Sequence, residues 1–358
     1  MTAEAASYQQ FIGACRAFWA GPMFRALQRQ VAAEAHARGI DAATDPAAFE
    51  HLVRQHSTHA VFAWFERHLQ RMKYSGRWDL APMYGAQRDA LLAQLAAAEA
   101  TGRLALDPAL TPPAYWLDHD IHQHPGGLGD DIAGFVYRAA VDQGGVVGRP
   151  QLHERFAQAA LAERSPASIL DMGCGYGRSA FAFAAAAPAA SVTGIDLSES
   201  CLRLAAIETP AALHNRVRFR RADAAAPGGE RFDMVTSTML LHELPDAALR
   251  TMIGETARLL EAGGVAVHLD FLPPADLLLR ILYDGHSDRN NEPFMRDLGR
   301  IDLVEAHRQA GFDRVEITPF AEADGALDEP ARRWRLPWTM IVATKSSSPK
   351  SLSQGAIP

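Results

Sequence analysis

The stretch 169–177 constrains the fold of this chain more than any other. A short apolar run ends in Asp171, and the residues 178–184 that come after the stretch, an arginine followed by small or apolar residues, predict the start of a helix. Between them lie three glycines at alternate positions, Gly173, Gly175 and Gly177. Glycine lets the backbone turn sharply and approach a ligand closely. A strand, a glycine turn and a helix in this order are typical of an adenosyl-cofactor site at the carboxyl end of a parallel strand.

Apolar strands alternate with helices around this stretch, which predicts crossovers packed on a parallel sheet. The predicted strands span residues 168–172, 191–196, 217–222, 232–236 and 264–270, and two further strands, 315–319 and 338–344, have no clear helix between them. The predicted helices span residues 152–163, 178–187, 199–208, 247–260 and 301–310. We therefore expect an α/β fold, a Rossmann-like sheet of seven strands that is mostly parallel and whose last strand is antiparallel.

The part of the chain before residue 150 has a different pattern, because it is mainly helical. Residues 46–73 and 87–100 carry apolar side chains at helical spacing. We expect three regions: a mainly α-helical N-terminal domain (1–150) that covers the substrate or dimerises, a cofactor-binding domain (151–345) and a disordered tail (346–358). No strand of the main sheet is expected from the first region.

Composition limits the class of protein. Apolar residues make up 48% of the 358, enough for a large core, and no apolar run reaches the ~20 residues of a membrane span. The net charge of −7 argues against a general nucleic-acid binder. The N-terminus does not resemble a secretory signal, and three scattered cysteines suggest reduced thiols, so a cytoplasmic location is expected.

The segment 152–345 resembles the class I S-adenosylmethionine-dependent methyltransferases. The resemblance covers slightly more than half of the chain and rests on elements in the right order: the glycine loop, the run 194–198 with sequence GIDLS, the run 221–224 with sequence RADA, the strand with sequence FDMV at 232–235, and LLEAGG at 259–264. It implies a Rossmann-like fold and S-adenosylmethionine as the cofactor. A nicotinamide enzyme is the nearest competitor, but its glycine pattern requires glycine where this chain has Arg178.

The cofactor site follows from strand ends and from this resemblance. Asp196 ends the second predicted strand, about 20 residues past the glycine loop, where a carboxylate can accept both ribose hydroxyls. The resemblance implies that Asp223 accepts from the adenine amino group and that Asp171 fixes the methionine end. Each acid also has a structural interpretation, as a helix cap or a turn residue. The predicted cofactor-binding set is Asp171, Gly173, Gly175, Gly177, Asp196, Leu197, Asp223, Ala224 and Thr238.

Three histidines are candidates for catalysis at the acceptor. His242 lies in the segment 238–245 after the fourth predicted strand, which commonly faces substrate and cofactor in the family. His122 and His124 lie in the polar segment 118–127 and point to one side if that segment is extended. They could act as a base, hold a substrate carboxylate or bind a metal, and surface positions are the alternative. We predict that all three face one cavity.

A long polar segment, 283–294, follows the fifth predicted strand and is expected to be a loop that contacts the substrate. His286 and Glu292 are its candidates for substrate binding.

Three interpretations of function follow. The first is a methyltransferase that uses S-adenosylmethionine and acts on a small-molecule O- or N-nucleophile or activated carbon, with a possible homodimer and no nucleic-acid or membrane partner. The second is a metal-assisted methyltransferase of an oxo-acid or catechol-like substrate. The third is a non-catalytic partner protein that binds the cofactor. The sequence does not identify the acceptor or the general base.

Overall fold

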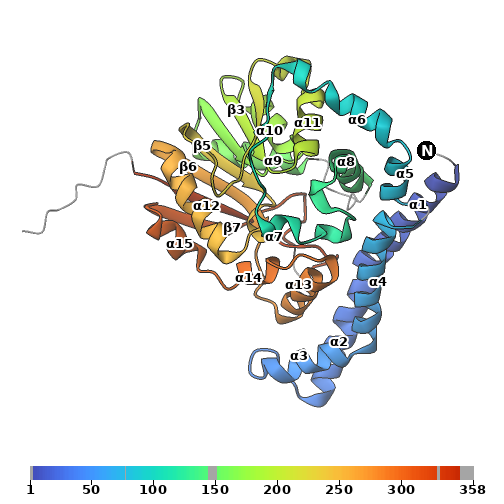
Figure 1. The fold of residues 1–358 in the computed structure, drawn as a ribbon. Helices are drawn as coiled ribbons and strands as arrows, with labels where there is room; N and C mark the ends of the chain where they lie inside the picture. The colour runs from blue at the N-terminus through green and yellow to red at the C-terminus, as the bar shows by residue number, and fades with distance from the viewer. Residues whose placement is uncertain (1–2, 77, 144–150, 329–330, 347–358) are drawn as a thin grey trace, which may run out of the picture.

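The computed structural model describes residues 3–76, 78–143, 151–328 and 331–346. A mostly parallel sheet lies between two layers of helices, and a long helical arm projects from one side (Figure 1). The expected boundary at residue 150 and nearly all of the expected tail lie outside the described residues, so the division into these regions stays a prediction.

The sheet has the order β1-β4-β3-β2-β5-β6-β8-β7, and only β8 is antiparallel to its neighbours. The mostly parallel Rossmann-like sheet is therefore confirmed, with β2 in the middle and the antiparallel strand last in the chain. The bounds are β1 Leu104–Ala105, β2 Ser168–Met172, β3 Ser191–Asp196, β4 Val217–Arg221, β5 Phe232–Thr238, β6 Leu260–Phe271, β7 Arg314–Pro319 and β8 Trp338–Thr344.

The eighth strand corrects the expectation of seven. β1 pairs in parallel with β4 through Leu104 opposite Phe219 and Ala105 opposite Arg220, so one strand of the sheet does come from before residue 150. Two residues are too few to show the alternation by which a strand is recognised in a sequence.

Each face of the sheet is covered by its own helices. Ile169 and Met234 belong to one apolar core with α9 and α10, whereas Leu170 and Val235 belong to another with α12 and α15. This division follows from the strand geometry, because successive side chains point to opposite faces. The helices of this part are α9 Leu152–Glu163, α10 Arg178–Ala186, α11 Glu199–Glu208, α12 Asp246–Leu259, α13 Leu277–Asn290, α14 Met295–Leu298 and α15 Leu303–Gln309, with short 3-10 turns η5 Ala211–Leu213 and η6 Leu241–Glu243.

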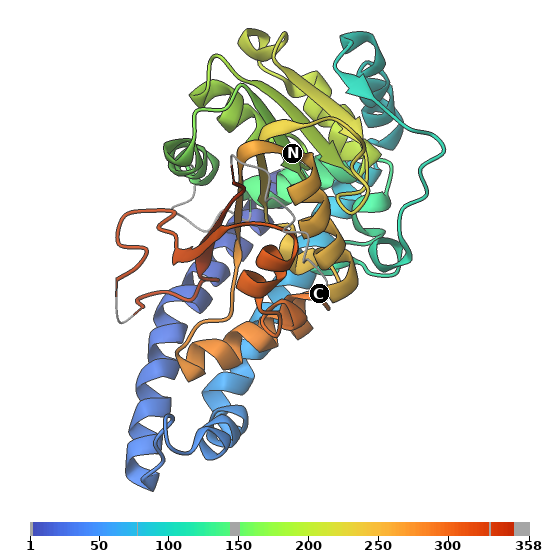
Figure 2. The same ribbon diagram turned by 90° about the vertical axis from the view of Figure 1, so that its left-hand side faces the viewer.

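The N-terminal helices form the arm and then return to the sheet (Figure 2). The helical pattern of 46–73 is interrupted at His56, whose backbone is extended and whose ring accepts a hydrogen bond from the N–H of Thr58. The elements are α1 Ala3–Phe18, the π-helical turn η1 Trp19–Met23, α2 Phe24–Arg38, α3 Pro46–Gln55, α4 Ser57–Tyr74, α5 Leu80–Gly85, α6 Arg88–Ala96, η2 Glu99–Thr101, α7 Ala114–Leu117, η3 Ile121–Gln123, η4 Gly127–Gly129 and α8 Ala133–Gln143.

The arm shares its core with the sheet domain. Phe24, Phe62 and Trp334 are buried together in the cluster that also holds Ile169 of β2 and Leu282 of α13. Burial of this kind fixes α2 and α4 against the sheet domain.

Candidate active site

The glycine loop joins β2 to α10 with three residues in the left-handed region. The φ angles are 66° at Gly173, 52° at Gly175 and 92° at Gly177. A Cβ at Gly177 would lie 2.8 Å from the Phe181 ring, so space as well as conformation requires glycine there. At Gly175 the nearest atom to a Cβ, on Tyr137, is 3.9 Å away, so its backbone borders open space.

Two aspartates at the ends of neighbouring strands, Asp171 (buried) and Asp196 (partly buried), hold the loop and the start of α10. Asp196, at the end of β3, accepts from the N–H of Gly175 (2.8 Å) and of Ser198 (2.8 Å), while Ser198 itself caps α11. Asp171, in β2, accepts from the Ser179 hydroxyl through Oδ2, but its buried Oδ1 has no hydrogen-bond partner. Burial raises the pKa of Asp171 to about 7 although the Ser179 hydrogen bond lowers it. An unpartnered carboxylate oxygen inside the protein is a vacant acceptor for a ligand donor.

The third predicted acid lies beyond β4. Asp223 accepts from the N–H of Ala225 (2.8 Å), and its charge adds to burial in raising the pKa of Tyr115. The Tyr115 hydroxyl and the Thr238 hydroxyl are buried and have no partner among the described residues. These groups, with Leu197 and Ala224 beside them in sequence, fit the polar edges of an adenosyl group. The residues at the strand ends therefore fit S-adenosylmethionine, although the role of each one stays a prediction.

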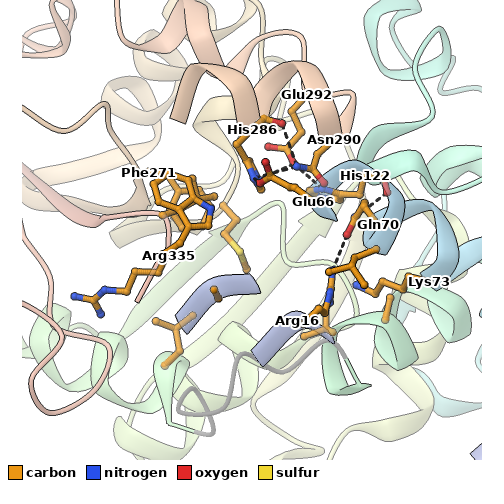
Figure 3. Close-up of a pocket in the computed structure, with 18 of the residues that line it drawn as sticks. Arg16, Glu66, Gln70, Lys73, His122, Phe271, His286, Asn290, Glu292 and Arg335 are labelled. Atoms are coloured by element: carbon orange, nitrogen blue, oxygen red, sulfur yellow. Dashed lines mark hydrogen bonds and ion pairs between the residues drawn. The ribbon is translucent and has the colours of Figure 1, made fainter. Parts of the chain in front are cut away.

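A cavity of about 600 Å³ lies next to this loop, between the strand ends and the N-terminal helices (Figure 3). α1, α4 and α13 form one side, and the ends of β5, β6 and β8 form the other. Its polar lining includes Arg16, Glu66, Gln70, Lys73, His122, His242, Glu243, His286, Asn290 and Glu292, and its apolar lining includes Trp19, Tyr74, Met239, Phe271, Trp334 and Trp338.

His242 is fixed in the cavity wall by Asp270. Its Nδ1 lies 2.5 Å from Asp270 Oδ1, and the same carboxylate accepts from the N–H of Leu241 (2.7 Å) and of Phe271 (2.7 Å). Because the carboxylate only accepts, Nδ1 carries a proton and Nε2 is left for other partners. Nε2 lies 3.4 Å from Glu243.

The charge around His242 changes its basicity. Burial alone would lower its pKa, but the carboxylates of Asp270 and Glu243 outweigh burial and raise the pKa well above the usual 6.5. His242 is therefore a stronger base than a free imidazole and is held in one orientation.

The prediction that three histidines share one cavity is wrong for His124. The segment is not extended, because His122 and Gln123 have positive φ angles of 57° and 60°, which breaks the alternation that we assumed. His122 lines the cavity, with Nδ1 2.8 Å from Glu292 and Nε2 3.6 Å from Glu243. His124 is buried outside the cavity lining and stacks on Tyr74, with ring centroids 5.0 Å apart.

The expected loop at 283–294 is wrong for most of its length, because α13 continues to Asn290. Its buried apolar side chains pack on α3 and α4, and polar groups of the same helix face the cavity, so its polarity reflects the cavity wall rather than a loop. His286 and Glu292 do line the cavity, and their ring Nε2 and carboxylate are 3.6 Å apart.

His286 also joins the two halves of the site. Its Nδ1 lies 2.6 Å from Glu66 of α4, and Glu66 is also paired with Arg289. Burial would lower the pKa of His286, but Glu292 and Glu66 raise it to about 9. A protonated His286 thus lies between two buried carboxylates and fixes α4 against α13.

Several groups of the site escaped the sequence analysis. Asp270 ends a predicted strand, as Asp171 and Asp196 do, and that position was a usable signal. Arg16 and Lys73 come from amphipathic helices and had no local signal. The four described non-glycine residues with positive φ are His122, Gln123, Met239 and Asn291, and all lie in or beside the cavity wall. Such strained backbone often gathers at functional sites.

Among the residues that the structure describes, no group of three or more His, Cys, Asp or Glu side chains is arranged to hold a metal ion. None of the described helices is long and apolar enough to cross a membrane.

The fold and the strand-end acids define a Rossmann-like cofactor domain of the class I methyltransferase type. Residues 169–264 match the family model described as a methyltransferase domain. Residues 169–264 therefore form a domain of the class I S-adenosylmethionine-dependent methyltransferase type, and S-adenosylmethionine is the cofactor of that domain.

Curated relatives resemble part of the chain. A ubiquinone biosynthesis O-methyltransferase of Thiobacillus denitrificans is 31% identical over 163 residues, which cover 42% of this chain and 66% of the relative. A trans-aconitate 2-methyltransferase of Methylobacterium radiotolerans is 37% identical over 102 residues, 28% of this chain and 36% of that protein. The chain thus spans about two thirds or less of the length of these relatives.

Among solved structures, the phosphoethanolamine N-methyltransferase 2 of Haemonchus contortus, in complex with S-adenosylmethionine, is 17% identical. It aligns with a TM-score of 0.40 over 53% of this chain and 52% of that chain.

Proposed function

We propose that the protein is a methyltransferase that uses S-adenosylmethionine and acts on a hydroxyl group of a small molecule. The observation that carries the proposal is the His242–Asp270 pair, which presents Nε2 to a cavity beside the cofactor loop. The names of the O-methyltransferase relatives support the same chemistry.

S-adenosylmethionine, when bound, supplies a methyl group on a sulfonium whose sulfur leaves as a neutral thioether. The cavity walls hold the acceptor oxygen in line with that methyl, and positioning of this kind supplies several kcal/mol. As the acceptor oxygen takes up the methyl group, its hydroxyl proton would pass to His242 Nε2. Asp270 stabilises the imidazolium that results.

The test is release of S-adenosylhomocysteine with a panel of hydroxyl-bearing acceptors. His242→Gln should lose turnover and keep cofactor affinity, whereas His36→Gln, an exposed histidine of α2, should keep both. Equal turnover in the His242 variant and the wild type would contradict the role of His242. No turnover with any acceptor, despite cofactor binding, would favour the non-catalytic interpretation. The same assay in the presence of a metal chelator tests the metal-assisted alternative, because loss of turnover with the chelator would favour it.

We also propose a homodimer formed through the arm. Phe11 and Phe18 of α1 and Trp64 of α4 are each at least half exposed, and Phe18 and Trp64 both contact the ring of Phe65. Exposed aromatic groups on neighbouring helices are typical of a protein interface.

A cytoplasmic location stays a prediction, supported by three free cysteines.

A further inference from the structure

Two basic side chains, Arg16 of α1 and Lys73 of α4, lie together on the cavity wall. Gln70 separates them from the histidine–glutamate cluster: its Oε1 accepts from Arg16 (2.8 Å) and its Nε2 donates to the carbonyl of His122 (2.8 Å). Figure 3 shows Arg16 and Lys73 on one side of Gln70. The side chains of Glu66, His286 and Glu292 lie on its other side. Gln70 thereby holds the guanidinium in a fixed place.

The carboxylates that line this cavity all have cationic or imidazole partners. Glu66 is paired with His286 and Arg289, Glu292 with His122 and His286, and Glu243 lies near His122 and His242; Asp142 lies 3.4 Å from Arg178.

Arg16 and Lys73 have no such partner. In the part of the chain that the structure describes, no carboxylate lies within ion-pair distance of either. The Lys73 amine lies 5.3 Å from the centre of the Tyr74 ring. Burial, and then Arg16, hold the pKa of Lys73 well below its usual 10.5. Two desolvated cations side by side are unfavourable until an anion joins them.

The choice of a lysine is itself unusual for this chain. The sequence has 32 arginines and three lysines, Lys73, Lys345 and Lys350. Lys345 donates to two backbone carbonyls, of Ala257 (3.0 Å) and Leu260 (3.2 Å), so its role is structural. Among the described residues, Lys73 makes no hydrogen bond of this kind.

We propose that Arg16 and Lys73 form a subsite for an oxyanion, a carboxylate or a phosphate, carried by the methyl acceptor. The inference rests on the proposed function and narrows its substrate class to hydroxyl compounds with an anionic group. Arginine and lysine donors suit both oxyanions. The aromatic lining of the same cavity, which includes Trp19, Tyr74 and Phe271, suits an acceptor with a flat apolar body.

Chemical labelling of Lys73 tests the subsite without turnover or cofactor. An amine with a lowered pKa is nucleophilic near neutral pH, and each of the three lysines can be followed by peptide mass spectrometry after reaction with acetic anhydride. The probes are 3,4-dihydroxybenzoate, 4-hydroxyphenyl phosphate and the uncharged 3,4-dihydroxybenzamide, each matched to sodium chloride of equal ionic strength. Lys345 serves as the internal reference.

We expect at least one of the two anions to slow labelling of Lys73 about tenfold at saturation, and the amide to have little effect. The anion that protects Lys73 more strongly shows whether the subsite prefers a carboxylate or a phosphate. Arg16→Gln should abolish the protection of Lys73. Arg71→Gln, which changes an exposed residue of α4, the helix that carries Lys73, should keep it. Equal protection by the amide, or no protection by either anion, would overturn the subsite.

This outcome is separate from that of the proposed function. Turnover with neutral acceptors but no protection of Lys73 would leave the methyltransferase proposal standing and remove the subsite. Protection of Lys73 by anions, with no methyl transfer to any acceptor, would leave the anion subsite standing and remove the methyltransferase proposal.

Discussion

Replacing Asp270 with asparagine tests the proposed base with the smallest change of shape. Asp270 accepts from three donors, the ring of His242 and the N–H groups of Leu241 and Phe271. An asparagine has one carbonyl oxygen, so its NH2 group must face at least one of these N–H groups. If it faces His242, the ring proton moves from Nδ1 to Nε2, which then has no lone pair to accept a proton from the acceptor.

The expected loss follows from the hydrogen bond that is removed. A hydrogen bond to a charged group is worth about 1.5–3 kcal/mol. If the whole of that energy is lost in the transition state, kcat falls by about 10- to 150-fold, since each 1.36 kcal/mol is a factor of ten. Because Asp270 helps to raise the pKa of His242, the variant should also have a lower pKa at that ring.

The assay is the pH dependence of kcat, measured by release of S-adenosylhomocysteine. In the wild type, kcat should rise with pH as His242 loses its proton above the usual imidazole range. In Asp270→Asn that rise should move to lower pH and reach a lower plateau. Calorimetric binding of S-adenosylmethionine and the circular dichroism spectrum should stay unchanged.

A rise at the same pH in both proteins would refute the reasoning, because it would assign the titration to another group. A normal plateau would also refute it, because Asp270 would then have no part in orienting His242. His242→Gln should show no such rise, which separates titration of this ring from ionisation of the acceptor itself.

Three further predictions concern the cofactor, acid stability and assembly. Asp196→Ala should weaken binding of S-adenosylmethionine about tenfold or more in calorimetry, because a charge-assisted acceptor is lost; unchanged affinity would exclude Asp196 from the site. Buried His268 has its pKa lowered to about 3 by burial and by His307, so its own contribution to stability should be constant above pH 6.5 and should fall by about 1.4 kcal/mol per unit as pH drops from 6.5 toward 3. His268→Gln should reduce the slope of stability against pH by that amount in chemical denaturation, and an equal slope in the variant and the wild type would contradict this origin. Phe18→Glu with Trp64→Glu should shift the mass in light scattering from dimer to monomer, whereas a wild type that is already monomeric would end the dimer proposal.

The sheet could be predicted well because its signals are local. Three strands, β2, β3 and β8, occur at the predicted residues, since buried strands are short apolar runs between polar turns. Two predictions of secondary structure were wrong, for different reasons. The strand β1 has only two residues, and the polar side of the helix α13 resembles a loop in sequence.

The catalytic side was harder because it depends on contacts between distant segments. His242 was predicted from its place after a strand. Its partner Asp270 lies 28 residues later, and the two meet only because β5 and β6 are neighbours in the sheet. His122 and His124 were assigned equal roles from an assumed extended backbone, but the left-handed backbone of His122 and Gln123 breaks that alternation.

The arm completes the site rather than merely covering it. Glu66, placed by α4, meets His286 of α13 at 2.6 Å, and that contact holds the helix whose last turn carries Lys73 toward the cavity. A cofactor domain alone, from β2 to β8, would retain His242 and Asp270 but would lack both cations proposed to bind the acceptor. The same strand-end chemistry can therefore serve different acceptors according to which helices pack against it, and in this chain α1 and α4 supply the charge that selects the substrate we propose.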